Sequence, residues 1–220
     1  MSRLRGLAAI VPLLMWVAGV ASAQGNVTDA ARQRYDKAGK SSNIQGVSRS
    51  MESADPQERL KGLRDLTSLE DEHAVDLLVQ ALGDGDMRVR AKAIDSCADL
   101  RATAATPVLV QQLFMRETSE PLKRRILAAL GKIGDSGAVK PIMDLLDQNL
   151  DTSTRGTAIF ALGDLGNADS LALLDQIAKD EDDLTLQRLA TQAATKVRYA
   201  QTQRASEANQ PLNTFLRPQQ

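Results

Sequence analysis

Few side chains in this sequence could perform acid-base or metal chemistry. The only histidine, His73, directly follows the acidic run Glu70-Asp71-Glu72, and such a set could bind a metal ion or carry a proton. A metal site needs several ligands at a suitable spacing, and no second histidine or cysteine stands at such a spacing from His73. The sequence therefore favours a solvated loop histidine over a metal or catalytic site.

The only cysteine, Cys97, is a second candidate, as a nucleophile. A reactive thiol needs exposure and a positive neighbourhood, whereas Cys97 stands on the apolar face of a predicted helix. No serine has a plausible base nearby in the sequence. We therefore expect Cys97 to be a small buried hydrophobe. We also expect the protein not to be an enzyme, with no cofactor and no metal ion.

Two acidic runs, at residues 84–86 and 180–183, could suggest calcium binding. Neither has the spaced ligand set of an EF-hand loop. Both directly precede a predicted helix, and their charge would favour the positive amino end of that helix. We interpret them as linker turns.

An internal repeat in the sequence predicts the helices on which these residues stand. Five equivalent apolar positions follow one another in steps of 31, 33, 32 and 32 residues: Leu66, Cys97, Leu130, Leu162 and Ala194. Eleven residues before each stands a typical helix N-cap: Asp55, Asp86, Ser119, Asp151 and Asp183. Apolar faces agree between copies, with Val89, Ala93, Cys97 and Leu100 matching Leu122, Ile126, Leu130 and Ile133. A period of this size indicates a solenoid.

A second helix follows each first one after a short break that carries Gly134-Asp135 or Gly166-Asn167 in two of the copies. Its apolar pairs repeat as well: Leu77-Leu78, Val108-Leu109, Pro141-Ile142 and Leu173-Leu174. Each unit is therefore an antiparallel helix pair. Residues 123–135 (KRRILAALGKIGD) and 154–166 (TRGTAIFALGDLG) resemble the short HEAT repeats called phycobilisome-lyase-like.

The resemblance covers residues 55 to 200 and implies an all-α, right-handed α-α superhelix of about four full helix pairs with degenerate capping units. It implies binding to other proteins as the main function. The family name also suggests an alternative, a chromophore-lyase-like enzyme or regulatory subunit. Two copies depart from the pattern. The first has Gly62, Thr67 and Glu70 where the pattern prefers alanine and glycines, and in the second Cys97-Ala98 replaces the Leu-Gly pair.

The first residues predict export. Arg3 and Arg5 precede an apolar run over residues 7–20, and Ala21-Ser22-Ala23 is a small-x-small site for cleavage before Gln24. The apolar run is shorter than the roughly 20 residues that a membrane-spanning helix needs. We expect a periplasmic or extracellular protein of a bacterial cell envelope.

The sequence thus divides into a signal peptide (1–23), a degenerate N-terminal capping repeat (24–54), the HEAT-like solenoid (55–208) and a flexible C-terminal tail (209–220). The capping repeat is predicted to hold helices near residues 27–38 and 43–53. A final first helix is predicted from about Asp183 into the early 200s without a second helix after it.

Two surfaces are candidates for binding. The first helices carry a cation at one repeat position, in Arg59, Arg90, Lys123 and Arg155, which could form a ladder with the acidic N-caps of neighbouring units, including Asp55, Asp86 and Asp151. A binder of anionic polymer or of a membrane surface is the alternative use of these cations. Nucleic acid is not expected as a partner, because the chain is mildly acidic.

The second helices carry a row of apolar residues, Val79, Val110 and Met143, extended by Phe114 and flanked by Gln80, Gln111 and Asp144. Second helices generally line the concave side of HEAT-like stacks, so the row could form a groove for a protein or peptide partner. The alternative is that these residues pack between adjacent second helices.

Overall fold

The computed structural model describes residues 44–69 and 73–208, and within these ranges it is helical and contains no strand. The chain divides into two compact units at Gly46 and Val47, and the first unit lies almost wholly outside the described residues. Residues 44–51 are helical, inside the range predicted for the second helix of the capping repeat. The predicted signal peptide, the helix at 27–38 and the C-terminal tail lie outside the described residues.

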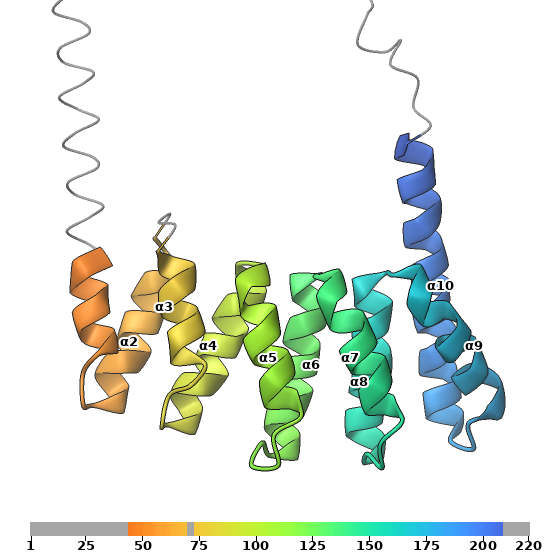
Figure 1. The fold of residues 1–220 in the computed structure, drawn as a ribbon, viewed down its shortest axis with the longest axis horizontal. Helices are drawn as coiled ribbons and strands as arrows, with labels where there is room; N and C mark the ends of the chain where they lie inside the picture. The colour runs from red at the N-terminus through yellow and green to blue at the C-terminus, as the bar shows by residue number, and fades with distance from the viewer. Residues whose placement is uncertain (1–43, 70–72, 209–220) are drawn as a thin grey trace, which may run out of the picture. The chain divides into compact units, whose positions relative to one another are not determined.

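Among the described residues from Val47 onward, the chain forms four helix pairs and one long final helix, side by side (Figure 1). The first helices are α2 (Pro56–Leu66), α4 (Met87–Asp99), α6 (Glu120–Ile133), α8 (Thr152–Leu165) and α10 (Leu184–Ala208). The second helices are α3 (Ala74–Ala81), α5 (Thr106–Leu113), α7 (Val139–Leu146) and α9 (Leu171–Asp180). Three of them follow 3-10 turns: η1 (Thr103–Ala105), η2 (Ser136–Ala138) and η3 (Ala168–Ser170).

The five equivalent apolar positions predicted from the repeat all lie in the core, since none is more than 1% exposed. Successive first helices pack directly on one another, from α2 against α4 to α8 against α10. Second helices contact the next unit mainly through its first helix, as α5 does with α6 and α7 with α8, and to a lesser extent through its 3-10 turn. The tightest packing therefore lies in the layer of first helices.

Two glycines explain that tight packing. A Cβ atom on Gly131 would lie 3.1 Å from the Cα of Ala161, and one on Gly163 would lie 3.0 Å from the Cα of Ala193. Both glycines directly follow a buried leucine of the repeat, and the partner alanines directly precede the equivalent position of the next unit. The Leu-Gly pair thus allows two helix backbones to approach closely, which a larger residue would prevent.

The predicted N-caps form in four of five units. Asp55, Asp86, Asp151 and Asp183 each accept a hydrogen bond from the backbone N–H two residues later. The prediction for Ser119 is wrong in this respect, because its side chain makes no capping bond. The residue two positions later is Pro121, which has no N–H to donate.

The turns after α4, α6 and α8 use the left-handed conformation, whereas Thr67 after α2 is right-handed. Gly134 and Gly166 cap α6 and α8 with φ of 80° and 61°. The equivalent residue after α4 is Arg101, with φ of 49°. This turn differs in a second way, because Leu100, predicted on the buried face, is 41% exposed. Helix α4 ends at Asp99, so Leu100 lies beyond the helical face that buries the equivalent Ile133 in α6.

Helix α10 closes this end of the repeat, as predicted, and no second helix follows it within the described residues. Toward its C-terminal end, α10 contacts the preceding unit through polar side chains. Arg198 donates to both carboxylate oxygens of Asp175 on α9, at 2.7 and 2.6 Å. Gln201 and Arg204 donate to the carbonyl of Gly166, which ends α8. No helix of the described residues is long and apolar enough to cross a membrane.

Candidate interaction surfaces

The predicted apolar row lies on successive second helices, with Val79 on α3, Val110 on α5 and Met143 on α7. All three side chains are half-buried, and the predicted flanking residues Gln80, Gln111 and Asp144 are exposed. Partial burial is compatible both with a groove and with packing between second helices. The binding role of the row therefore stays a prediction.

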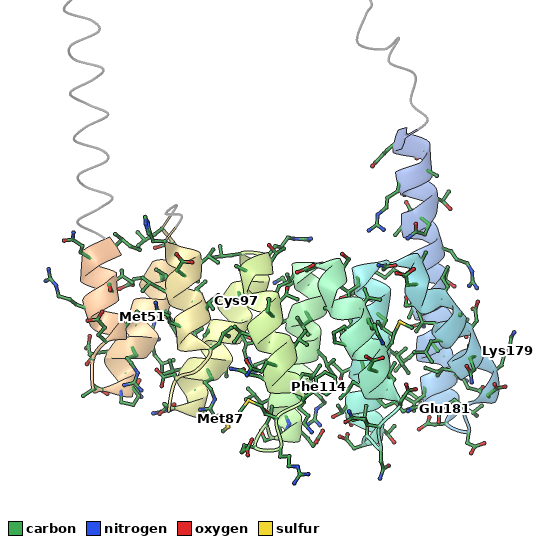
Figure 2. All side chains as sticks on the ribbon, viewed as in Figure 1. Met51, Met87, Cys97, Phe114, Lys179 and Glu181 are labelled. Atoms are coloured by element: carbon green, nitrogen blue, oxygen red, sulfur yellow. The ribbon has the colours of Figure 1, made fainter. Side chains whose placement is uncertain are left out.

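Phe114, the predicted extension of the row, lies just after the end of α5 and is 43% exposed (Figure 2). Its neighbour Met115 is 44% exposed, which makes a small apolar patch at this turn. Asp144 is engaged within its own helix, because Lys140 donates to it at 2.8 Å. The structure thus brings the predicted residues to one layer without joining them through polar contacts.

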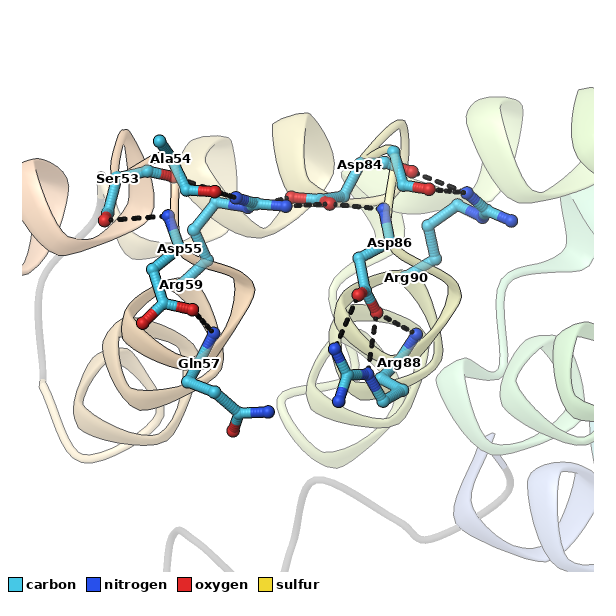
Figure 3. Close-up of polar contacts among 10 residues, drawn as sticks. Ser53, Ala54, Asp55, Gln57, Arg59, Asp84, Asp86, Arg88 and Arg90 are labelled. Atoms are coloured by element: carbon cyan, nitrogen blue, oxygen red, sulfur yellow. Dashed lines mark hydrogen bonds and ion pairs between the residues drawn. The ribbon is translucent and has the colours of Figure 1, made fainter.

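The predicted ladder of cations exists at the turns between units, but with different partners (Figure 3). Arg59 donates from Nε and Nη2 to the two carboxylate oxygens of Asp84, at 2.7 and 2.8 Å. Its Nη1 donates to the carbonyls of Ser53 and Ala54, just before its own helix. The acid that Arg59 binds stands two residues before the next N-cap, Asp86, and is not the cap itself. The side chain of Asp86 instead accepts a hydrogen bond from the backbone N–H of Arg88.

The other ladder positions vary. Arg155 repeats the pattern of Arg59, because its Nε donates to Glu181, two residues before the N-cap Asp183. Arg90 donates to the carbonyls of Asp84 and Gly85. Lys123 pairs with Glu120 of its own helix. The contacts of Arg59 and Arg155 join neighbouring helix pairs at their turns, so these two members of the ladder have a structural role.

Hydrogen bonds shift the pKa values of the ladder's acids. The guanidinium of Arg59 holds the pKa of Asp84 below its ordinary value, and the amide of Asp86 adds to this effect. The side chain and the amide of Arg88 both lower the pKa of Asp86. Both carboxylates remain charged in mildly acidic solution, so the pairing of Asp84 with Arg59 persists there.

A second set of ion pairs crosses the exposed side of the first helices. Lys132 on α6 donates to Asp99 on α4 at 2.6 Å, and Lys196 on α10 donates to Asp164 on α8. All four residues occupy one repeat position, two residues after the buried anchor, and their charges alternate along the row. The sequence carried this signal, but it becomes visible only when that position is compared across copies.

The first helices α4, α6 and α8 also line a hollow of about 690 Å³. Four cations and two carboxylates surround it: Lys92, Arg124, Arg125, Lys132, Asp95 and Asp99. Small or uncharged residues complete the lining: Ala98, Pro121, Ala128, Ala129 and Thr157. The volume is within the range of roughly 300–1,000 Å³ that is usual for ligand sites. We call this feature the first-helix hollow.

Neither of the two candidates for chemistry is among the residues that form these surfaces. Cys97 is buried, as predicted, and burial raises the pKa of its thiol to about 12. Such a thiol is not a nucleophile near neutral pH. His73 is exposed and precedes α3, while the acidic residues before it lie outside the described residues. Within the described part of the chain, no group of three or more histidine, cysteine and acidic side chains could hold a metal ion.

These observations define a solenoid of stacked helix pairs, and comparison with known proteins agrees. A family model of HEAT repeats matches residues 46–114 and 111–195, most of the chain. The protein therefore belongs to the HEAT repeat family. The finer resemblance to the phycobilisome-lyase-like units stays a prediction.

Two solved structures are similar to this chain. An engineered protein is 18% identical with a TM-score of 0.54, over 71% of this chain and 80% of its own. A designed armadillo repeat protein for modular peptide recognition is 20% identical with a TM-score of 0.48, over 70% of this chain and 81% of its own. At such low identity the first likeness indicates the fold alone. No curated protein sequence matches.

Proposed function

We propose that this protein is an exported scaffold or adaptor that binds another protein in a bacterial cell envelope. The observation that supports it best is the stack itself, in which equivalent residues of successive helices form rows across several units. Rows of this kind give a long surface on a rigid core, which suits recognition of a polypeptide.

Export rests on the sequence of residues 1–23, with its positive start, apolar run and small-x-small site. Cleavage before Gln24 removes Arg3 and Arg5 and changes the formal charge from −1 to −3. Intact-mass measurement of the protein from a cell-envelope fraction tests this location. Loss of residues 1 to 23 is the expected result, and a mature form that retains Met1 would contradict export through this signal.

The scaffold role is tested by chemical cross-linking in the native cells, followed by purification and identification of the joined proteins. We expect one or a few proteins of the same compartment to be recovered reproducibly. Their recovery should fall when surface residues of one layer are changed and the fold is kept. Recovery of the chain alone, under conditions where a known complex of the envelope is captured, would contradict the scaffold role.

The chromophore-lyase alternative lacks a supporting group, because the thiol of Cys97 is buried with a raised pKa. The alternative of an anionic polymer or membrane surface does have one observation in its favour, the cations of the first-helix hollow. Binding to vesicles of anionic lipid, compared with neutral lipid, is the direct measurement for that alternative.

A further inference from the structure

The first-helix hollow carries an excess of positive charge that the chain as a whole lacks. Its four cations face two carboxylates, whereas the full sequence has a formal charge of −1. Two of the cations are already paired, since Arg125 binds Asp95 and Lys132 binds Asp99, each at 2.6 Å. The excess therefore belongs to the other two.

Lys92 and Arg124 are these two cations. Lys92 on α4 forms no ion pair with any other described residue. Arg124 on α6 reaches Asp151 only at 3.7 Å and the hydroxyl of Thr154 at 3.4 Å, both through Nη1. The remaining nitrogens of its guanidinium form no hydrogen bond within the described part of the chain. Two groups with unused donors thus border one hollow.

The floor between them is small and apolar. Ala98, Ala128 and Ala129 come from two neighbouring helices, and none has a side chain long enough to block the approach of a peptide backbone. The positive field also acts on a neighbouring group, because the hydrogen bond from Lys132 and the nearby charges of Lys132 and Lys92 lower the pKa of Asp99. The hollow thus combines room for a chain segment with donors for carboxylates.

We propose that the first-helix hollow binds an acidic segment of the partner protein, with carboxylates of that segment on Lys92 and Arg124. This proposal rests on the proposed scaffold function and assigns the surface and the chemistry of the partner. A polypeptide fits better than a uniform polyanion, because Asp95 and Asp99 lie among the cations and repel a continuous row of phosphates.

The test uses the full chain and a short fluorescent peptide in which glutamates alternate with alanines. A matched peptide has glutamine at each glutamate. Fluorescence anisotropy at low ionic strength is expected to show binding of the glutamate peptide only, weakened by added salt. Equal binding of both peptides, or of neither, would overturn the proposal.

Variants locate the site. The double variant Lys92→Gln with Arg124→Gln should weaken binding about tenfold, since two exposed charge pairs are lost. Its control, Lys140→Gln with Lys179→Gln, removes the same charge from the second helices α7 and α9 and should bind as the unchanged protein does. Circular dichroism checks that both remain helical. An equal loss in the two variants would overturn the proposal, because general charge would then explain binding.

A third variant is expected to increase the affinity for the glutamate peptide, so damage to the fold could not produce the expected result. Asp99→Asn removes a repelling carboxylate and frees Lys132, so the glutamate peptide should bind several-fold more tightly. Unchanged or weaker binding would contradict the site. Vesicles of anionic lipid that bind tightly, with the same dependence on Lys92 and Arg124, would assign the hollow to a membrane surface instead.

The outcomes also separate this proposal from the scaffold function. If cross-linking recovers a protein partner but the glutamate peptide does not bind, the hollow is wrong and the scaffold stands. If the peptide binds through Lys92 and Arg124 but no protein is ever recovered, the scaffold function fails while the hollow remains an acidic-ligand site.

Discussion

At the scale of single residues, one position in the turns after α4, α6 and α8 is left-handed and differs between units in its conformational free energy. Gly134 and Gly166 adopt a left-handed conformation that glycine tolerates easily. Arg101 adopts it with a side chain, which costs roughly 1–2 kcal/mol for an L-residue. The second turn is therefore a weak point of the repeat.

Replacing Arg101 with glycine should stabilise the protein by roughly 0.5–1 kcal/mol, because relief of the backbone strain exceeds the larger entropy of the unfolded chain. Urea unfolding at equilibrium measures the change. Arg101→Ala is the matched control, since it removes the long side chain and keeps the Cβ atom. If the alanine variant gained as much as the glycine variant, backbone strain would not be the cause.

The ion pair of Asp84 and Arg59 predicts a dependence of stability on pH. The pKa of Asp84 is lowered in the folded protein, whereas an unfolded chain has the ordinary value of about 3.9. The stabilisation is thus complete above pH 4 to 5, and it is lost as the pH falls through the ordinary value toward the folded one.

Asp84→Asn should therefore lower stability at neutral pH, and its deficit should shrink as the solution is acidified below about pH 4. Thermal unfolding at a series of pH values measures both. Asp147→Asn, at an exposed aspartate after α7, serves as the control. A deficit that stays constant from neutral to acidic pH would contradict the assigned pairing.

At the scale of helices, the two layers of the repeat are held differently. First helices approach each other closely through small residues such as Gly131 and Gly163, while second helices contact the next unit through its first helix and its 3-10 turn rather than through its second helix. The first-helix layer should therefore be sensitive to size, and the second-helix layer more tolerant.

Gly163→Ala tests this difference, because the added Cβ atom would lie 3.0 Å from the Cα of Ala193. Separation of α8 and α10 should cost about 1–3 kcal/mol in the free energy of unfolding, as overpacking does in other cores. Gly85→Ala is the control, since nothing lies within 4 Å of its added Cβ atom. Equal stability of the two variants would show that close helix approach is not required.

The anchors of the repeat give a further prediction. Leu130 and Leu162 are fully buried in neighbouring first helices, so replacing either by alanine should cost on the order of 2–5 kcal/mol. The loss should spread to adjacent units, because each repeat is buried by its neighbours. Hydrogen exchange of the backbone amides would show the spread, and protection lost only in the altered helix would contradict it.

At the scale of the whole molecule, the period of the sequence predicted the helix pairs and the buried anchors. It did so because burial forces the same residue type at the same position in each unit. It did not predict the missing cap at Ser119, where Pro121 removes the donor, or the strained Arg101. The first-helix hollow was also missed, because the free donors of Lys92 and Arg124 depend on which neighbours reach them in space.

The most direct test of the account is photo-cross-linking from defined positions in the native cells. A photoreactive amino acid is placed at Ala128, an exposed position in the first-helix hollow, and in a second variant at Val110 in the predicted row of the second helices. We predict that Ala128 yields an adduct with another protein, and that Lys92→Gln with Arg124→Gln abolishes it. Protein adducts from Val110 alone would assign binding to the second helices. No protein adduct from either position would contradict the account.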